Sequence, residues 1–168
     1  MSSAGDSSGT KGSRAISVTL PGQPFLRHYS GHQLVTWQPR GTLDDVMLDE
    51  IAEWLVDFEA LSPPFRRFVD LSQLTSIAVR TRHIFDFART RAEQYAGSEP
   101  ARSAVFDDDM VGFGIARMYE SLMANTRVHV HAFHDRRSAA AWLGVPIDVL
   151  TIKDEPVPDT GGTAAKSI

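Results

Sequence analysis

Three histidines and an aspartate fall within the nine residues RVHVHAFHD, residues 127–135. Imidazole and carboxylate groups bind zinc and act as general bases, so this segment offers the clearest chemistry in the chain. If residues 127–133 form a strand, His129 and His131 share one face, whereas His134 has the opposite parity and ends the strand. Two imidazoles are one ligand short of even an open zinc site. We therefore predict no bound metal here.

A catalytic use of these histidines would need a nucleophile or an acid within reach. Asp135 stands between the expected strand and the next helix, where it is the natural N-cap. The chain has no Gly-x-Ser-x-Gly motif. Gly112 and Gly114 lie inside an expected helix and lack the third glycine of a phosphate-binding loop, so close helix packing explains them better. We predict that the protein is not an enzyme and uses no cofactor.

Length, charge and composition narrow the class of protein. The 168 residues suffice for one domain with a sizeable core. A formal net charge of −4 argues against a general nucleic-acid binder, which needs a basic surface. Cysteine is absent, which excludes disulfides and fits a reducing compartment. No apolar run approaches the roughly 20 residues of a membrane-spanning helix, so we expect a cytoplasmic protein without membrane insertion.

Both ends of the chain differ in composition from its middle. Residues 1–22 are rich in serine and glycine without periodicity, which is typical of a disordered lead. Residues 151–168 have the same character and are expected to be a disordered tail. The folded domain is therefore predicted at residues 23–150.

Alternating strand and helix patterns fill this middle part. A helix capped by Thr42 and running to about Leu61 has an apolar face at spacings of three and four. The order predicts an α/β sheet with parallel pairs, and the opening hairpin adds an antiparallel edge. The expected strands are 25–30, 33–38, 65–71, 101–106 and 127–133, and the later helices are 79–96, 110–124 and 136–143.

Four segments in this order resemble the SpoIIAA-like group of the STAS domains, which are named for sulfate transporters and anti-sigma-factor antagonists. They are TWQPRGTL, RRFVDLSQLTSI, GIARMYESL and HAFHDRRSAAAWL, and the similarity covers about residues 24–145. The resemblance implies a mixed sheet of four to five strands with about four helices packed mainly on one face. It also implies a non-enzymatic domain that binds protein partners, with a fold likened to lipid-binding CRAL-TRIO domains.

Many domains of this family are switched by phosphorylation of a serine at the start of the second helix. The family pattern Asp-Leu-Ser, five residues, Asp-Ser-Ser-Gly matches its first part at residues 70–72. The second part falls on residues 78–81, Ala-Val-Arg-Thr, so the usual phosphoacceptor is missing. We therefore do not expect this switch. The hydroxyl groups that could replace it are those of Ser72, Thr75, Ser76 and Thr81, and each has an ordinary explanation in a turn or cap.

Charge is segregated between two stretches. Residues 43–61 hold seven acidic side chains and no basic one, whereas residues 65–91 hold six arginines against two aspartates. A solvated helix face explains most of this, but the pattern also suits self-association or a charged partner. Arg80 and Arg82, near a helix N-terminus, could hold an anion.

Two functions follow from these patterns. The first is an interaction or regulatory module, expected to be a homodimer with a possible regulatory protein partner. Its candidate dimer face carries His129, His131 and Phe133, because no helix obviously covers that side of the sheet. The alternative is a carrier or sensor of a small apolar or lipid-like ligand held between helices and sheet. Its candidate ligand contacts are Phe113, Met118 and Met123.

Overall fold

The computed structural model describes residues 17–20, 23–60 and 66–151. Most of the predicted lead and tail, residues 1–16 and 152–168, lies outside the described residues. Strand β1 (Ser17–Leu20) falls inside the stretch predicted as the lead. Its four residues, next to a proline and a glycine, are too few for an alternating pattern to stand out in the sequence.

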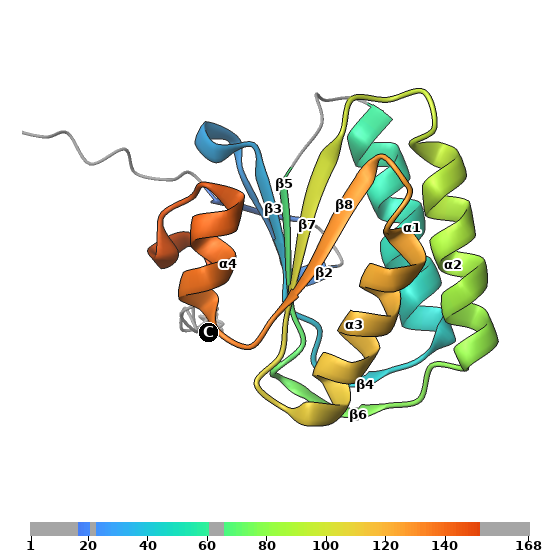
Figure 1. The fold of residues 1–168 in the computed structure, drawn as a ribbon. Coiled ribbons are helices and arrows are strands. Elements are labelled where there is room, and N and C mark those ends of the chain that lie inside the picture. The colour runs from blue at the N-terminus through green and yellow to red at the C-terminus, as the bar shows by residue number, and fades with distance from the viewer. Residues whose placement is uncertain (1–16, 21–22, 61–65, 152–168) are drawn as a thin grey trace, which may run out of the picture.

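A six-stranded mixed sheet in the order β1-β2-β3-β5-β7-β8 forms the centre of the protein (Figure 1). The pairs β1-β2 and β2-β3 are antiparallel, and the pairs from β3 to β8 are parallel. The predicted α/β class, parallel pairs and antiparallel edge are confirmed, and β1 adds one strand to the expected number. The strands are β2 (Gln23–Tyr29), β3 (Leu34–Trp37), β5 (Arg66–Asp70), β7 (Ala101–Phe106) and β8 (Val128–Phe133), with the 3-10 turn η1 (Ser30–His32) between β2 and β3.

Two short strands that the sequence did not reveal form a separate parallel pair. They are β4 (Gly41–Leu43) and β6 (Leu74–Ile77). Thr42 lies in β4, where its Oγ1 is 2.7 Å from the Oγ of Ser76, so its predicted role as a helix cap is wrong. The cap is Asp44, whose Oδ1 accepts a hydrogen bond from the Met47 N–H at 2.9 Å. Both residue types cap helices well, and β-pairing decides which of them is free to do so.

Helices α1 (Asp45–Ala60), α2 (Thr81–Gln94) and α3 (Met110–Met123) lie together on one face of the sheet (Figure 1). The strands β3, β5, β7 and β8 follow one another across the sheet in one direction. Right-handed crossovers between strands ordered in this way place every connecting helix on the same side. The core beneath them includes Leu55, Ala88, Ala116 and Val130. None of the helices in the described part of the chain is long and apolar enough to cross a membrane.

Helix α4 (Arg136–Leu143) covers the opposite face of the sheet, together with the 3-10 turn η2 (Ile147–Val149) (Figure 1). Its bounds match the sequence prediction. The predicted cap is confirmed as well, because the Asp135 carboxylate accepts a hydrogen bond from the Ser138 N–H. Leu143 packs there in a second core with Phe68, Phe106 and Phe133. The expectation that this face lacks a covering helix is therefore wrong.

Strand β8 is an edge strand, and helix α3 protects it. The Glu120 carboxylate reaches the strand from α3 and accepts hydrogen bonds from the Ala132 N–H at 3.3 Å and from Nδ1 of His131 at 2.7 Å. An edge N–H that is satisfied in this way is a poor template for pairing with another chain. The edge therefore gives no direct support to a dimer built by strand addition.

Candidate functional site

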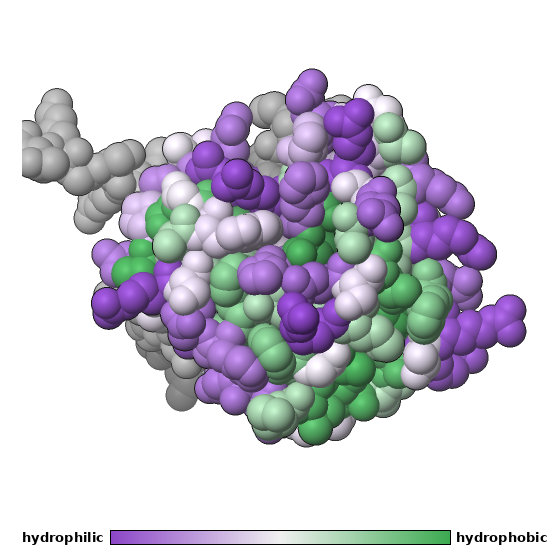
Figure 2. Space-filling view, viewed as in Figure 1, coloured by the Kyte–Doolittle hydropathy of each residue, from purple (hydrophilic) through white to green (hydrophobic). Residues whose placement is uncertain are grey.

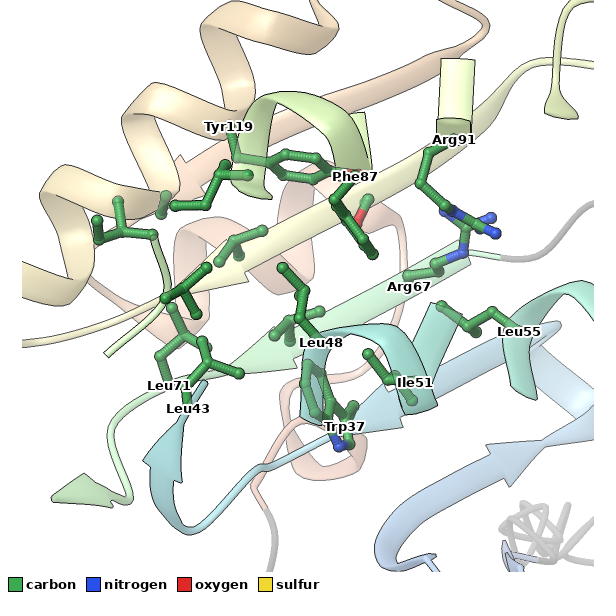
Figure 3. Close-up of a pocket in the computed structure, with 17 residues that line it drawn as sticks. Trp37, Leu43, Leu48, Ile51, Leu55, Arg67, Leu71, Phe87, Arg91 and Tyr119 are labelled. Carbon is green, nitrogen blue, oxygen red and sulfur yellow. The ribbon is translucent and has the colours of Figure 1, made fainter. Parts of the chain in front are cut away.

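A pocket of about 110 Å³ lies between the three helices and the sheet (Figure 3). Its walls are mainly aliphatic and aromatic. Strands β3, β5 and β7 supply the floor, and helices α1, α2 and α3 supply the roof. The lining residues are Trp37, Leu43, Leu48, Ile51, Leu55, Arg67, Val69, Leu71, Val79, Ile84, Phe87, Arg91, Ser103, Val105, Ile115, Ala116 and Tyr119.

Two arginines form one end of this pocket. Arg67 and Arg91 are only 5% and 1% exposed, and both pair with Glu59 near the end of α1. The Arg91 Nη2 lies 3.0 Å from the Glu59 Oε2. Arg67 also donates to the Tyr95 hydroxyl. Burial raises the pKa of Tyr95 to about 12, so this hydroxyl stays neutral at physiological pH.

The arginines of residues 65–91 were attributed mostly to a solvated helix face, and for Arg91 this is wrong. Arg91 is buried on the same stripe as Ile84 and Ala88. Its spacing of seven from Ile84 and three from Ala88 is the helical signal that could have revealed it. Arginine is rarely buried fully without a partner, so its residue type argued for the surface. The partner, Glu59, lies 32 residues away in the chain.

The three predicted ligand contacts on α3 do not line the pocket. Met123 is buried in the core, and Phe113 stacks on His134 with ring centroids 3.4 Å apart. Met118 is half-buried away from the pocket. Their neighbours Ile115, Ala116 and Tyr119 line it instead. The pocket therefore borders other residues of α3 than the three that were predicted.

The segregated charges of α1 and α2 pair with each other. Asp45 at the start of α1 accepts hydrogen bonds from both the N–H and the Nε of Arg80, and the Arg80 N–H lowers the pKa of Asp45. His83 Nε2 lies 2.7 Å from the Asp49 Oδ1. The N-terminus of α2, where Arg80 and Arg82 were candidates to hold an external anion, thus already has an internal carboxylate. Arg82 is exposed.

Two of the candidate hydroxyls near β5 and β6, those of Ser72 and Ser76, have partners within the fold. Ser72 donates to the buried carboxylate of Asp70 at 2.6 Å, and Arg136 binds the same carboxylate at 2.7 Å. A phosphate on Ser72 would bring a dianion against Asp70, which is unfavourable. Ser76 bonds to Thr42, as described above, and Thr75 is exposed on β6. The structure brings none of the three to the pocket.

The histidine segment separates as its parity predicted. His129 is exposed and His131 half-buried on the α4 side of β8, whereas Val128, Val130 and Ala132 enter the core under α1 to α3. Phe133, a predicted dimer contact, is buried under α4. Within the described residues, no three histidine or carboxylate side chains are grouped to hold a metal ion.

Comparisons with known proteins find similarity among solved structures alone. No family model matches the chain, and no curated protein matches it. A similar solved structure is that of an uncharacterized protein of the DUF3478 family from Shewanella loihica PV-4. It is 15% identical, covers 66% of this chain and 83% of its own, and has a TM-score of 0.45. Its fold is described as SpoIIAA-like, the fold that the sequence motifs resemble.

Proposed function

We propose that this protein is a non-enzymatic, STAS-type module that binds a small, mainly apolar ligand between its helices and its sheet. The observation that carries this proposal is the apolar pocket under α1, α2 and α3. Two features that suggested a protein partner have partners within the domain instead. The acidic and basic helices pair with each other, and α4 covers the sheet face that was expected to be open.

The size of the pocket limits the ligand. Its volume of about 110 Å³ is close to that of an engineered apolar cavity of about 150 Å³ that binds benzene. A pocket of this size suits a single ring or a short alkyl chain. A complete long-chain lipid would extend beyond it.

Native mass spectrometry of protein purified without detergent tests this function. We expect a co-purified adduct of low mass, or uptake of added hexanol. Ala116→Leu places a larger side chain in the pocket wall and should abolish both, while circular dichroism stays native. Met118→Leu, away from the pocket, is the matched control and should bind as wild type does. Binding that survives Ala116→Leu would contradict the proposed site.

A second candidate is an interaction module, and a specific surface feature favours it. Met110 and Val111 begin α3 and are 76% and 67% exposed. Hydrophobic surface gathers at this lower end of the molecule (Figure 2). Adjacent exposed apolar side chains often mark a contact site. We propose this end, rather than the face with His129 and His131, as the contact site of a homodimer or a regulatory protein partner in the cytoplasm.

Sedimentation velocity at tens of micromolar protein tests the homodimer. A dimer that dissociates in Val111→Glu supports contact through this end of α3. A monomer at these concentrations, or a dimer that Val111→Glu leaves intact, counts against it. His129→Glu, on the exposed part of β8, is the control and tests the face that the sequence suggested.

A further inference from the structure

Arg67 occupies an unusual place for a charged residue. It lies in β5, in the middle of the parallel part of the sheet, with Val35 and Ser103 beside it in the neighbouring strands. Its side chain lies on the face covered by α1, α2 and α3 and is 5% exposed. A buried charge at such a position is costly unless it is neutralised.

Arg67, Arg91 and Glu59 form a buried cluster, and its positive charge is only partly neutralised. In the described part of the chain, the ion pairs of Arg67 and Arg91 converge on one carboxylate, that of Glu59. The remaining partners of the two guanidinium groups are the neutral Tyr95 hydroxyl and the neutral Gln94 amide. The Arg67 Nε is buried without any hydrogen-bond partner among the described residues. Two positive charges therefore face one negative charge, and one donor is unused.

The uncompensated charge lies at one end of the pocket. Arg67 and Arg91 both line it, and Figure 3 shows their guanidinium groups close to one another. Leu43 and Leu71 lie at the far end of the same pocket in that view. One end is thus positively charged and the other is apolar, which matches a ligand with a negative head and an apolar body.

We propose that the pocket binds a small amphipathic carboxylate, with its head against Arg67 and Arg91 and its apolar body toward Leu43 and Leu71. This inference rests on the proposed function and names the chemical class of its ligand. A monoanion balances the net charge of the cluster, and guanidinium groups bind carboxylates through charge-assisted hydrogen bonds. No bond is made or broken in the ligand.

Isothermal titration calorimetry with hexanoate and hexanol, at neutral pH and on the wild-type protein, tests this inference. The two probes share an apolar chain and differ in the charge of the head. We expect hexanoate to bind on the order of tenfold more tightly than hexanol, because a hydrogen bond to a charged group contributes that much. This comparison does not depend on any variant being able to fold.

Variants of single arginines then show which side chain causes the preference for hexanoate over hexanol. Arg67→Met should bring the affinity for hexanoate down to that for hexanol, and Arg67→Lys should keep part of the difference. Arg82→Met removes an exposed arginine of α2 and should leave both affinities unchanged. Circular dichroism spectra confirm that each variant is folded before it is compared.

The possible results separate this inference from the proposed function. Equal binding of hexanoate and hexanol would overturn the anionic head site and leave the apolar pocket standing. Tight hexanoate binding that persists in Arg67→Met would also overturn it, because the head would then lie elsewhere. Binding of neither probe would overturn the proposed function and this inference together.

Discussion

At the scale of single residues, the cluster of Arg67, Arg91 and Glu59 predicts that two substitutions change the unfolding free energy by different amounts. Glu59→Gln leaves the buried Arg67 and Arg91 without a carboxylate and should cost about 3–5 kcal/mol of unfolding free energy. Arg67→Met leaves Arg91 and Glu59 as a balanced pair and should change the stability by less than about 1 kcal/mol. Urea denaturation of both variants measures the difference. Equal losses would show that the cluster is a balanced structural network without excess charge.

A second prediction at this scale concerns Asp107, which follows β7. Burial raises the pKa of Asp107 above its ordinary 3.8, and the nearby carboxylates of Asp108, Asp109 and Asp70 add repulsion. The folded protein therefore holds this proton more tightly than the unfolded chain does. The stabilising contribution of the protonated group is complete below pH 3.8 and is lost as the pH rises through the raised pKa.

Asp107→Asn should therefore raise the melting temperature at pH 7, because the neutral amide has no charge to desolvate. Its Oδ1 can still accept the Asp109 N–H, which lies 2.9 Å from the Asp107 Oδ1. The advantage over wild type should disappear as the pH approaches 3.8 and below. Thermal melts across this range measure it, with Asp57→Asn as the control, because Asp57 is exposed on α1 and does not contribute to the raised pKa of Asp107. A lower melting temperature at pH 7 would contradict the proposed effect of burial.

At the scale of an element, the two glycines of α3, Gly112 and Gly114, have different surroundings. A Cβ at Gly112 would lie 1.5 Å from the Oδ2 of Asp107, whereas a Cβ at Gly114 would meet nothing within 4 Å. Gly112→Ala should therefore destabilise the protein by about 1–3 kcal/mol, because the buried Asp107 must move. Gly114→Ala should stabilise it by about 0.5–1 kcal/mol, because alanine loses less conformational entropy in a helix. Chemical denaturation of this matched pair checks both signs, and destabilisation by both would refute the distinction.

At the scale of the whole molecule, α4 is an integral layer of the domain. Leu143 is 1% exposed and packs on the sheet with Phe68 and Phe133. Leu143→Ala should cost about 2–5 kcal/mol, because it removes buried apolar atoms and leaves a cavity. Ile147→Ala, at a partly exposed position in the following turn, should cost less than about 1 kcal/mol. Equal small losses in thermal or urea unfolding would mean that α4 is only loosely attached.

Local patterns in the sequence were sufficient for the longer helices and strands, but they did not reveal β1, β4 and β6. The spans of β7 and α4 agree with the predictions, and Asp135 caps its helix as expected. Alternation also assigned His129 and Val130 to opposite faces of β8 correctly. These features depend on interactions between residues a few positions apart, which the order of residue types records directly.

The tertiary structure alone decided where α4 and the buried charges lie. Right-handed crossovers constrain a helix only when a parallel strand follows it, and no described strand follows α4, so its side of the sheet depended on packing. Arg67 and Arg91 pair with Glu59 across 8 and 32 residues, and the periodicity of one segment records no such partner. Alternation therefore placed His129 and His131 on the correct face of β8, whereas the helix over that face and the charged end of the pocket required the assembled fold.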